Sequence, residues 1–235
     1  MFGRIPVWLL DVVNPDYNFN ISDYYNLAWE AVFDIWKRGK LSILVGGSGF
    51  YLKAVVDGIG TMGVLPNTEL RQELSILSVE LLSQKLKKMD QKRKLKNQSA
   101  NWRTKINPPT DGQKSKILWI GLTAEKKILY EKIDRRVDER LKIGAVEETK
   151  KLAKKYGWDI SSMSGIGYRQ LRQYIEGKVS LDEAAARWKR AEHDYAQKQQ
   201  TWFKKDKRII WFNAAKKDIK EKVAEVVREW YTLNV

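Results

Sequence analysis

The sequence predicts an α/β protein in which short apolar strands alternate with amphipathic helices. Four runs rich in β-branched and aromatic residues are expected to form strands, at residues 7–12, 41–45, 117–121 and 209–212. Between and after these runs, apolar residues recur at i, i+3 and i+4, which is typical of helices. Because strands that alternate with helices need crossover connections, we expect the sheet to be parallel, with flanking helices.

The composition excludes several classes of site. The 235 residues contain no cysteine and one histidine, His193, which excludes disulfides, thiolate zinc sites and metal sites built from several histidines. A Mg²⁺ ion held by oxygen ligands stays open. No run is long and apolar enough to span a bilayer, and the start lacks the pattern of a signal peptide. We therefore expect a cytoplasmic protein.

A strong positive charge is the main global signal. The formal net charge is +15 and the isoelectric point is about 9.7. This charge favours a polyanionic partner, a nucleic acid before a membrane, although a generally basic solvated surface is the alternative. Ten tryptophans and ten tyrosines could stack on bases, but most of them are expected in the core.

A glycine turn at residues 46–49 follows the second expected strand. It consists of Gly46, Gly47, Ser48 and Gly49, and an amphipathic run begins directly after it. In a strand–turn–helix unit, the unpaired N–H groups at the helix start could bind a phosphate or nucleotide, and glycine lets the ligand approach closely. The alternative is a tight turn whose glycines serve local geometry alone. It is not a Walker A loop, since no Gly-Lys-Ser/Thr follows.

A helical and basic insertion is expected at residues 66–114, within a core formed by residues 1–65 and 115–235. Apolar spacing predicts one helix over residues 69–89, and nine lysines and arginines between residues 85 and 105 face one acid, Asp90. This basic stretch is either a phosphate-binding arm or a solvated linker, the latter slightly favoured. On the helix after the third strand, charges of mixed sign between Glu131 and Arg140 are expected to be solvated.

Four stretches, in this order and spacing, resemble the tRNA dimethylallyltransferase family. The first is residues 10–16 with Ile21-Ser22-Asp23-Tyr24, and the second is Val45-Gly46-Gly47-Ser48-Gly49-Phe50-Tyr51-Leu52-Lys53-Ala54. The third is the helix containing Arg136-Val137-Asp138, Gly144 and Glu147-Glu148. The fourth combines Gly167-Tyr168-Arg169-Gln170, Ser180-Leu181-Asp182-Glu183 and Gln199-Gln200-Thr201-Trp202-Phe203. The resemblance covers almost the whole chain.

The resemblance implies a partial P-loop-NTPase-like parallel sheet and transfer of a dimethylallyl group to an adenosine beside the anticodon. The implied substrates are dimethylallyl diphosphate and a tRNA anticodon stem-loop, the implied cofactor is Mg²⁺, and a monomer is expected. By motif position, Gly46, Gly47 and Ser48 would line the substrate pocket, with Ser48 against the tRNA. Arg71 would touch the anticodon stem, and Lys198 and Arg169 would meet the diphosphate or RNA phosphate.

The chain also departs from the family pattern. The family's P-loop strand and its Asp-Ser-x-Gln-Val-Tyr segment, which holds the presumed base, belong before Met1, so we expect a truncated chain that is weak or inactive alone. His193 stands where the family has an arginine, and as a lone histidine on a helix it is expected at the surface. Two alternatives remain, a basic RNA-binding remnant without chemistry and a fragment of another P-loop-related kinase or transferase. The Thr201-Trp202-Phe203 ending disfavours the last.

Overall fold

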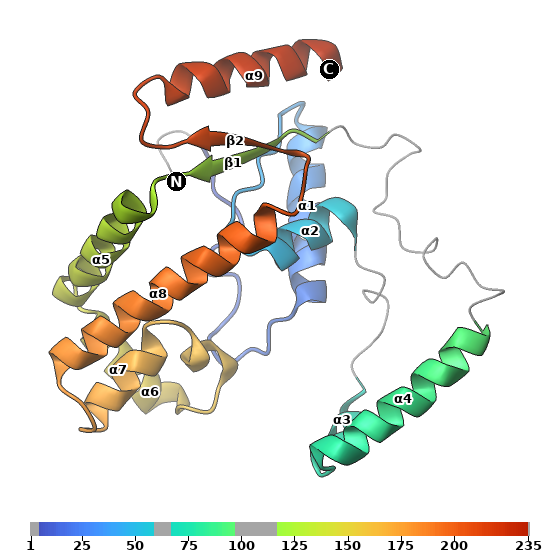
Figure 1. Ribbon diagram of the computed structural model, residues 1–235, viewed down its shortest axis with the longest axis vertical. Helices are drawn as coiled ribbons and strands as arrows, with labels where there is room; N and C mark the ends of the chain where they lie inside the picture. Colours follow the sequence, from blue (N-terminus) through green and yellow to red (C-terminus); the bar gives the residue numbers. More distant parts are fainter. Residues whose placement is uncertain (1–4, 59–66, 97–116, 235) are drawn as a thin grey trace. The chain divides into compact units, whose positions relative to one another are not determined.

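The computed structural model describes residues 5–58, 67–96 and 117–234 (Figure 1). It is a mixed α/β structure, mostly helical, with a small parallel sheet, which confirms the predicted fold class. Strand β1, Trp119–Thr123, pairs in parallel with β2, Ile209–Asn213, and Trp119 lies opposite Ile209. These strands match the third and fourth strands that the sequence predicts.

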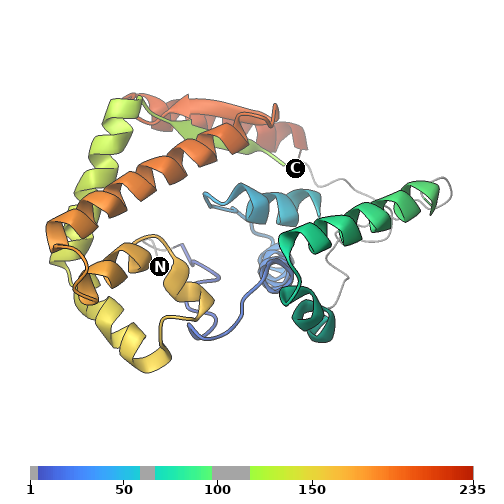
Figure 2. The same ribbon diagram turned by 60° about the horizontal axis from the view of Figure 1, so that its bottom comes forward.

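Helices make up most of the described chain. Helix α8 is the longest, and it passes α5 and α7 in the views of Figures 1 and 2, in agreement with its contacts. The helices are α1 Ile21–Lys37, α2 Gly49–Asp57, α3 Thr68–Ser75, α4 Val79–Lys96, α5 Lys126–Lys142, α6 Ala145–Tyr156, α7 Tyr168–Ile175, α8 Leu181–Phe203 and α9 Ile219–Asn234, with a short 3-10 helix, η2, at Ser161–Ser164. None of these described helices has the length and apolar character needed to cross a membrane.

Side-chain caps explain where several helices begin. The Ser180 hydroxyl accepts a hydrogen bond from the Glu183 N–H at 3.2 Å and so caps the start of α8. Asn67 caps α3 through the N–H of Leu70 at 2.8 Å. The single helix predicted over residues 69–89 is wrong, because it divides into α3 and α4. Ser78 accepts from the N–H of Leu81 and starts a new helix instead of continuing the old one.

The other two predicted strands are wrong. In residues 7–12, Leu9 has φ 63° and Asp11 has φ 52°, and these left-handed conformations interrupt an extended run. Residues 41–45 contain no strand, and the side chains of Ile43 and Val45 are 75% and 85% exposed. A strand needs hydrogen bonds to a neighbouring strand, and the sheet of the described residues consists of β1 and β2 alone.

The chain divides into two compact units. The first contains Met1–Asn20, Ser42–Gly49 and Lys114–Val235, and the second contains Ile21–Leu41 and Phe50–Gln113. The division into a core of residues 1–65 and 115–235 and an insertion of residues 66–114 follows the chain order and stays a prediction. Most of the predicted basic stretch, residues 85–105, lies outside the residues whose side chains the structure describes.

A cluster of Val137, Leu171 and Trp188 forms the core of the first unit. These side chains come from α5, α7 and α8, and partly buried apolar residues surround them. In the second unit, α1 buries Tyr25, Ala28 and Trp29, and α2 buries Ala54 and Val55. The apolar spacing of the sequence thus becomes a separate small core in each unit.

Candidate functional site

The glycine turn lies where the sequence places it, directly before a helix. Gly46, Gly47 and Ser48 form irregular chain, and Gly49 is the first residue of α2. The turn and helix of the predicted unit are therefore confirmed, while its strand is wrong. Gly46 and Ser48 are exposed and Gly47 is half-buried, so a ligand could reach the backbone of the turn.

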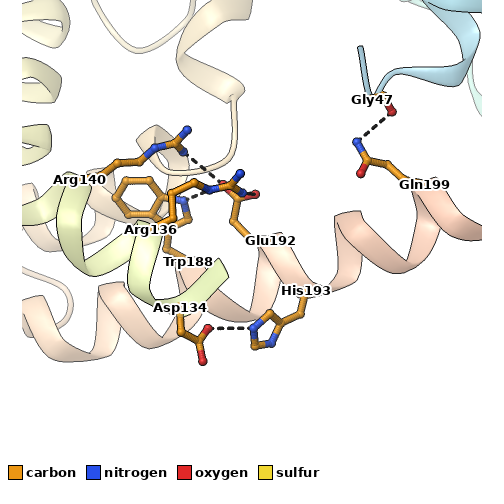
Figure 3. A network of polar contacts seen from close by, with 8 residues as sticks. All are labelled: Gly47, Asp134, Arg136, Arg140, Trp188, Glu192, His193 and Gln199. Carbon is orange, nitrogen blue, oxygen red and sulfur yellow. Dashed lines mark hydrogen bonds and ion pairs between the residues drawn. The ribbon is translucent and has the colours of Figure 1, made fainter. Parts of the chain in front are cut away.

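The end of α8 supports the glycine turn (Figure 3). The side-chain amide of Gln199 donates a hydrogen bond to the carbonyl oxygen of Gly47 at 2.8 Å. A Cβ at position 47 would lie 2.2 Å from Nε2 of Gln199, and a Cβ at Gly49 would lie 2.0 Å from Cδ1 of Trp202. Gln199 and Trp202 are three positions apart and share one face of α8. Close packing on this face thus accounts for glycine at positions 47 and 49.

The buried carboxylate of Glu192 links α8 to α5 (Figure 3). Glu192 accepts hydrogen bonds from Arg136 at 3.1 Å, from Arg140 at 3.5 Å and from the indole N–H of Trp188 at 3.3 Å. Glu192 is among the buried residues of the protein. Two cations and an indole donor compensate for the loss of water around this carboxylate.

A second set of contacts runs along the same pair of helices. Nε2 of His193 lies 2.8 Å from an oxygen of Asp134, and the imidazole stacks on the ring of Tyr130, with centroids 3.8 Å apart. Further along, Lys189 pairs with Asp138 at 2.7 Å. His193, which the sequence places at the surface, is partly buried, because its side chain is 20% exposed and packs against α5.

The prediction of a simply solvated charged face on α5 is therefore wrong in part. Asp134, Arg136, Asp138 and Arg140 turn toward α8 and find partners there. Sequence reasoning missed this because it assessed α5 alone. Acids and arginines at i, i+4 spacing on α5, together with Lys189, Glu192 and His193 on α8, were the signal that could have revealed it.

The charged residues predicted to bind RNA or diphosphate are exposed. Lys198 lies on α8 next to Gln199 in the chain, Arg169 lies in the first turn of α7, and Arg71 lies on α3 in the second unit. Within the described residues, none of the three forms an ion pair, so their charges are available to a phosphate. In the chain, Lys198 directly precedes Gln199, the residue that holds the glycine turn. Arg71 belongs to the other unit and is described only within it.

An apolar groove in the first unit was not foreseen. Its volume is about 360 Å³, and it is lined by Val13, Asn14, Pro15, Tyr17, Phe19, Leu152, Ser161, Ser162, Met163 and Tyr168. The hydroxyl of Ser162 donates to the carbonyl oxygen of Pro15 at 2.9 Å, which fastens the N-terminal segment to η2. The hydroxyl of Tyr168 donates to Glu148.

Tyr168 is expected to ionise late in an alkaline titration. Burial and its hydrogen bond to Glu148 raise the pKa of Tyr168 from 10.0 to about 12. Because the folded protein holds this proton more tightly than the unfolded chain, the contribution to stability is complete below about pH 10 and is lost as the pH rises through 12. Ultraviolet titration should show that Tyr168→Phe removes a tyrosine that ionises near pH 12, and loss of one that ionises near pH 10 would contradict this.

The family model that describes IPP transferases matches residues 3–206, which include the glycine turn, α5 and all of α8. The chain belongs to the IPP transferase family. Similar proteins include tRNA dimethylallyltransferases of Roseiflexus sp. (strain RS-1), 35% identical over 97% of this chain and 81% of the relative, and of Halalkalibacterium halodurans, 31% identical over 94% and 78%. They confirm the family and the enzyme class that the motifs predict.

Solved structures of the IPP transferase family share the fold. The crystal structure of the full-length tRNA isopentenylpyrophosphate transferase from Bacillus halodurans matches with a TM-score of 0.70 and 30% identity, over 98% of this chain and 81% of that one. A eukaryotic dimethylallyltransferase acting on tRNA matches with a TM-score of 0.73 over 95% of this chain and 65% of that one. Its identity of 19% supports the fold alone.

Proposed function

We propose that this protein is a tRNA prenyltransferase, which transfers a dimethylallyl group from dimethylallyl diphosphate to the N6 amine of the adenosine next to the anticodon. One observation carries the proposal, namely the similarity to a tRNA dimethylallyltransferase over 97% of the chain. The glycine turn and its support on α8 both lie within the matched part of the chain.

In the proposed reaction, the amine nitrogen forms a bond to the allylic carbon. The bond from that carbon to the diphosphate oxygen breaks, the diphosphate leaves, and a base takes one proton from the amine. The adenine has to leave its stack to reach the pocket. Gly46, Gly47 and Ser48 would line this pocket, with Ser48 against the tRNA.

Cationic side chains would contact phosphates in this reaction. Lys198 and Arg169 would meet the leaving diphosphate or the RNA backbone, where positive charge stabilises the charge that develops on the departing group. Arg71 would contact the anticodon stem from the second unit. All three are exposed, as these roles require.

Mg²⁺ belongs to the proposal as a partner of the diphosphate. The described residues contain no group of three or more acidic or histidine side chains that could hold a metal by themselves. A dedicated protein cage for the ion therefore does not fit these residues.

A basic RNA-binding protein without chemistry is the second candidate. The net charge of +15 favours it, together with the absence of a Gly-x-x-x-x-Gly-Lys-Ser/Thr motif from the 235 residues. Digestion of a treated anticodon stem-loop to nucleosides, followed by mass spectrometry, separates the two candidates. Dimethylallyladenosine in the digest supports the transferase, and binding without any such product supports the second candidate.

The transferase proposal also includes the expectation that the protein is a monomer and is located in the cytoplasm.

Binding of an anticodon stem-loop is expected to weaken steeply as salt rises. Each phosphate neutralised on a single strand contributes about −0.7 to the slope of log affinity against log salt. Lys198→Ala should make the slope shallower by about that amount if Lys198 meets a phosphate. Lys151→Ala, which removes an exposed lysine from α6, is the matched control and should leave the slope unchanged. Fluorescence anisotropy at several salt concentrations measures both slopes, and a flat response in the unmodified protein would refute the RNA-binding proposal.

A further inference from the structure

The glycine turn depends on one side chain for its hydrogen-bonded anchorage. Residues 46–48 lie outside the sheet, so no strand ladder fixes their backbone. Among the described residues, the bond from Gln199 to the Gly47 carbonyl is the hydrogen bond that ties these three residues to another element. The two partners are 152 positions apart in the chain, so this contact exists only when the first unit is folded.

The direction of this bond determines where the next backbone donor points. A peptide group is planar and trans, so the carbonyl of Gly47 and the N–H of Ser48 point in opposite directions. Because the carbonyl faces Gln199, the Ser48 N–H faces away from α8. Ser48 is exposed, and no partner for its N–H is present within the described residues. This donor is thus held toward the side from which a ligand can approach.

Trp202 supports the turn at its other end. The indole occupies the space that a side chain at position 49 would need, since a Cβ there would lie 2.0 Å from Cδ1 of Trp202. Gln199 therefore sets the direction of the Gly47–Ser48 peptide, while Trp202 limits how closely Gly49 approaches α8. The hydrogen bond from Gln199 and the packing of Trp202 together restrict the turn more than either contact would alone.

We propose that Gln199 is a positioning residue for the proposed transfer reaction, assisted by Trp202. Gln199 fixes the Gly47–Ser48 peptide so that the Ser48 N–H points toward an anionic or carbonyl oxygen of the bound substrate. The inference rests on the proposed function. In this role Gln199 contacts the turn and does not contact the reacting atoms.

The first test measures the turn without any substrate. Gln199→Glu keeps the size of the side chain but replaces the donating amide with an oxygen that faces another oxygen. We expect the NMR order parameters of the backbone amides at residues 46–49 to fall from about 0.85, typical of rigid backbone, toward about 0.6, because the turn loses the hydrogen bond that anchors it. Gln200→Glu adds the same charge one position along α8 and should leave these order parameters unchanged. Equal order parameters in Gln199→Glu and the unmodified protein would overturn the proposal.

The second test separates positioning from a general structural role. With dimethylallyl diphosphate and an anticodon stem-loop, Gln199→Glu should lower kcat while the KM for RNA stays close to that of Gln200→Glu. A change in KM alone would assign Gln199 to RNA binding and overturn the positioning role. If neither the variants nor the unmodified protein form dimethylallyladenosine, the proposed function fails, whereas the order parameters still decide whether Gln199 holds the turn.

Discussion

Replacement of Trp188 by alanine is expected to lower the free energy of unfolding by about 3–5 kcal/mol. The side chain is 4% exposed and lies in the core cluster with Val137 and Leu171. Its ring also fills the space beside Gly167, where a Cβ would approach Cζ2 to 2.8 Å. Removing the indole leaves a cavity among α5, α7 and α8, and it also takes one hydrogen-bond donor from the buried carboxylate of Glu192.

Two further variants separate the contributions of packing and hydrogen bonding. Trp188→Phe keeps an aromatic ring in the core but lacks the N–H, so its cost should lie well below that of the alanine variant. Tyr195→Ala removes an aromatic side chain that is 40% exposed on the same helix, and it should change stability by only about 0.5 kcal/mol. Denaturant unfolding followed by circular dichroism measures all three. Equal losses for Trp188→Ala and Tyr195→Ala would contradict the assigned core.

Helix periodicity predicted the elements better than it predicted their burial. The apolar stripe of α8 includes Ala184 and Trp188, which are buried, and also Tyr195 and Trp202, which are exposed. The stripe is one continuous face in the sequence. Only its first half meets the core of α5 and α7, whereas the second half meets the glycine turn. A sequence pattern indicates which face is apolar, but the neighbouring elements decide how much of that face is covered.

The strand predictions were limited by a similar dependence on neighbours. Residues 41–45 have the composition of a strand, as residues 209–212 do, yet only the latter pair with another strand. Strand propensity reports the fit of a side chain to a pleated surface and depends on what lies beside it. The left-handed conformations of Leu9 and Asp11 also have no signature in the sequence, because neither residue is a glycine.

The sequence predicted the glycine turn of the candidate site but not the side chains that hold this turn in place. Three glycines in four residues identified the turn, since glycine permits close approach of another group. The group that approaches is Gln199, a residue without any periodic signal, whose partner is 152 positions away. The carboxylate of Glu192 was missed for the same reason, because its compensating arginines lie on another helix.

Prenyl transfer by the 235-residue chain is expected to be at least about 100-fold slower than transfer by the tRNA dimethylallyltransferase of Halalkalibacterium halodurans. The 235 residues contain no Gly-x-x-x-x-Gly-Lys-Ser/Thr motif to cradle the diphosphate. The glycine turn can supply backbone N–H groups, but no lysine follows it directly to balance the leaving charge. Loss of a single electrostatic donor costs about 10²–10³ in rate, and here the lysine of that motif is absent from the 235 residues and the base is unassigned.

The proton acceptor decides how slow the reaction becomes. A base must lie within hydrogen-bond reach of the adenine amine, and among the described residues no carboxylate is hydrogen-bonded to the glycine turn. Transfer of labelled dimethylallyl diphosphate to one anticodon stem-loop, with both proteins at equal concentration, gives the ratio of turnover numbers. A stem-loop with guanosine in place of the target adenosine controls for label that is not bound at N6.

Comparable turnover by the two proteins would mean that this chain carries its own base and diphosphate site. Asp11 and Asp16 would then be the first carboxylates to replace with asparagine, because both occur in the motif that resembles the family's aspartate-containing segment.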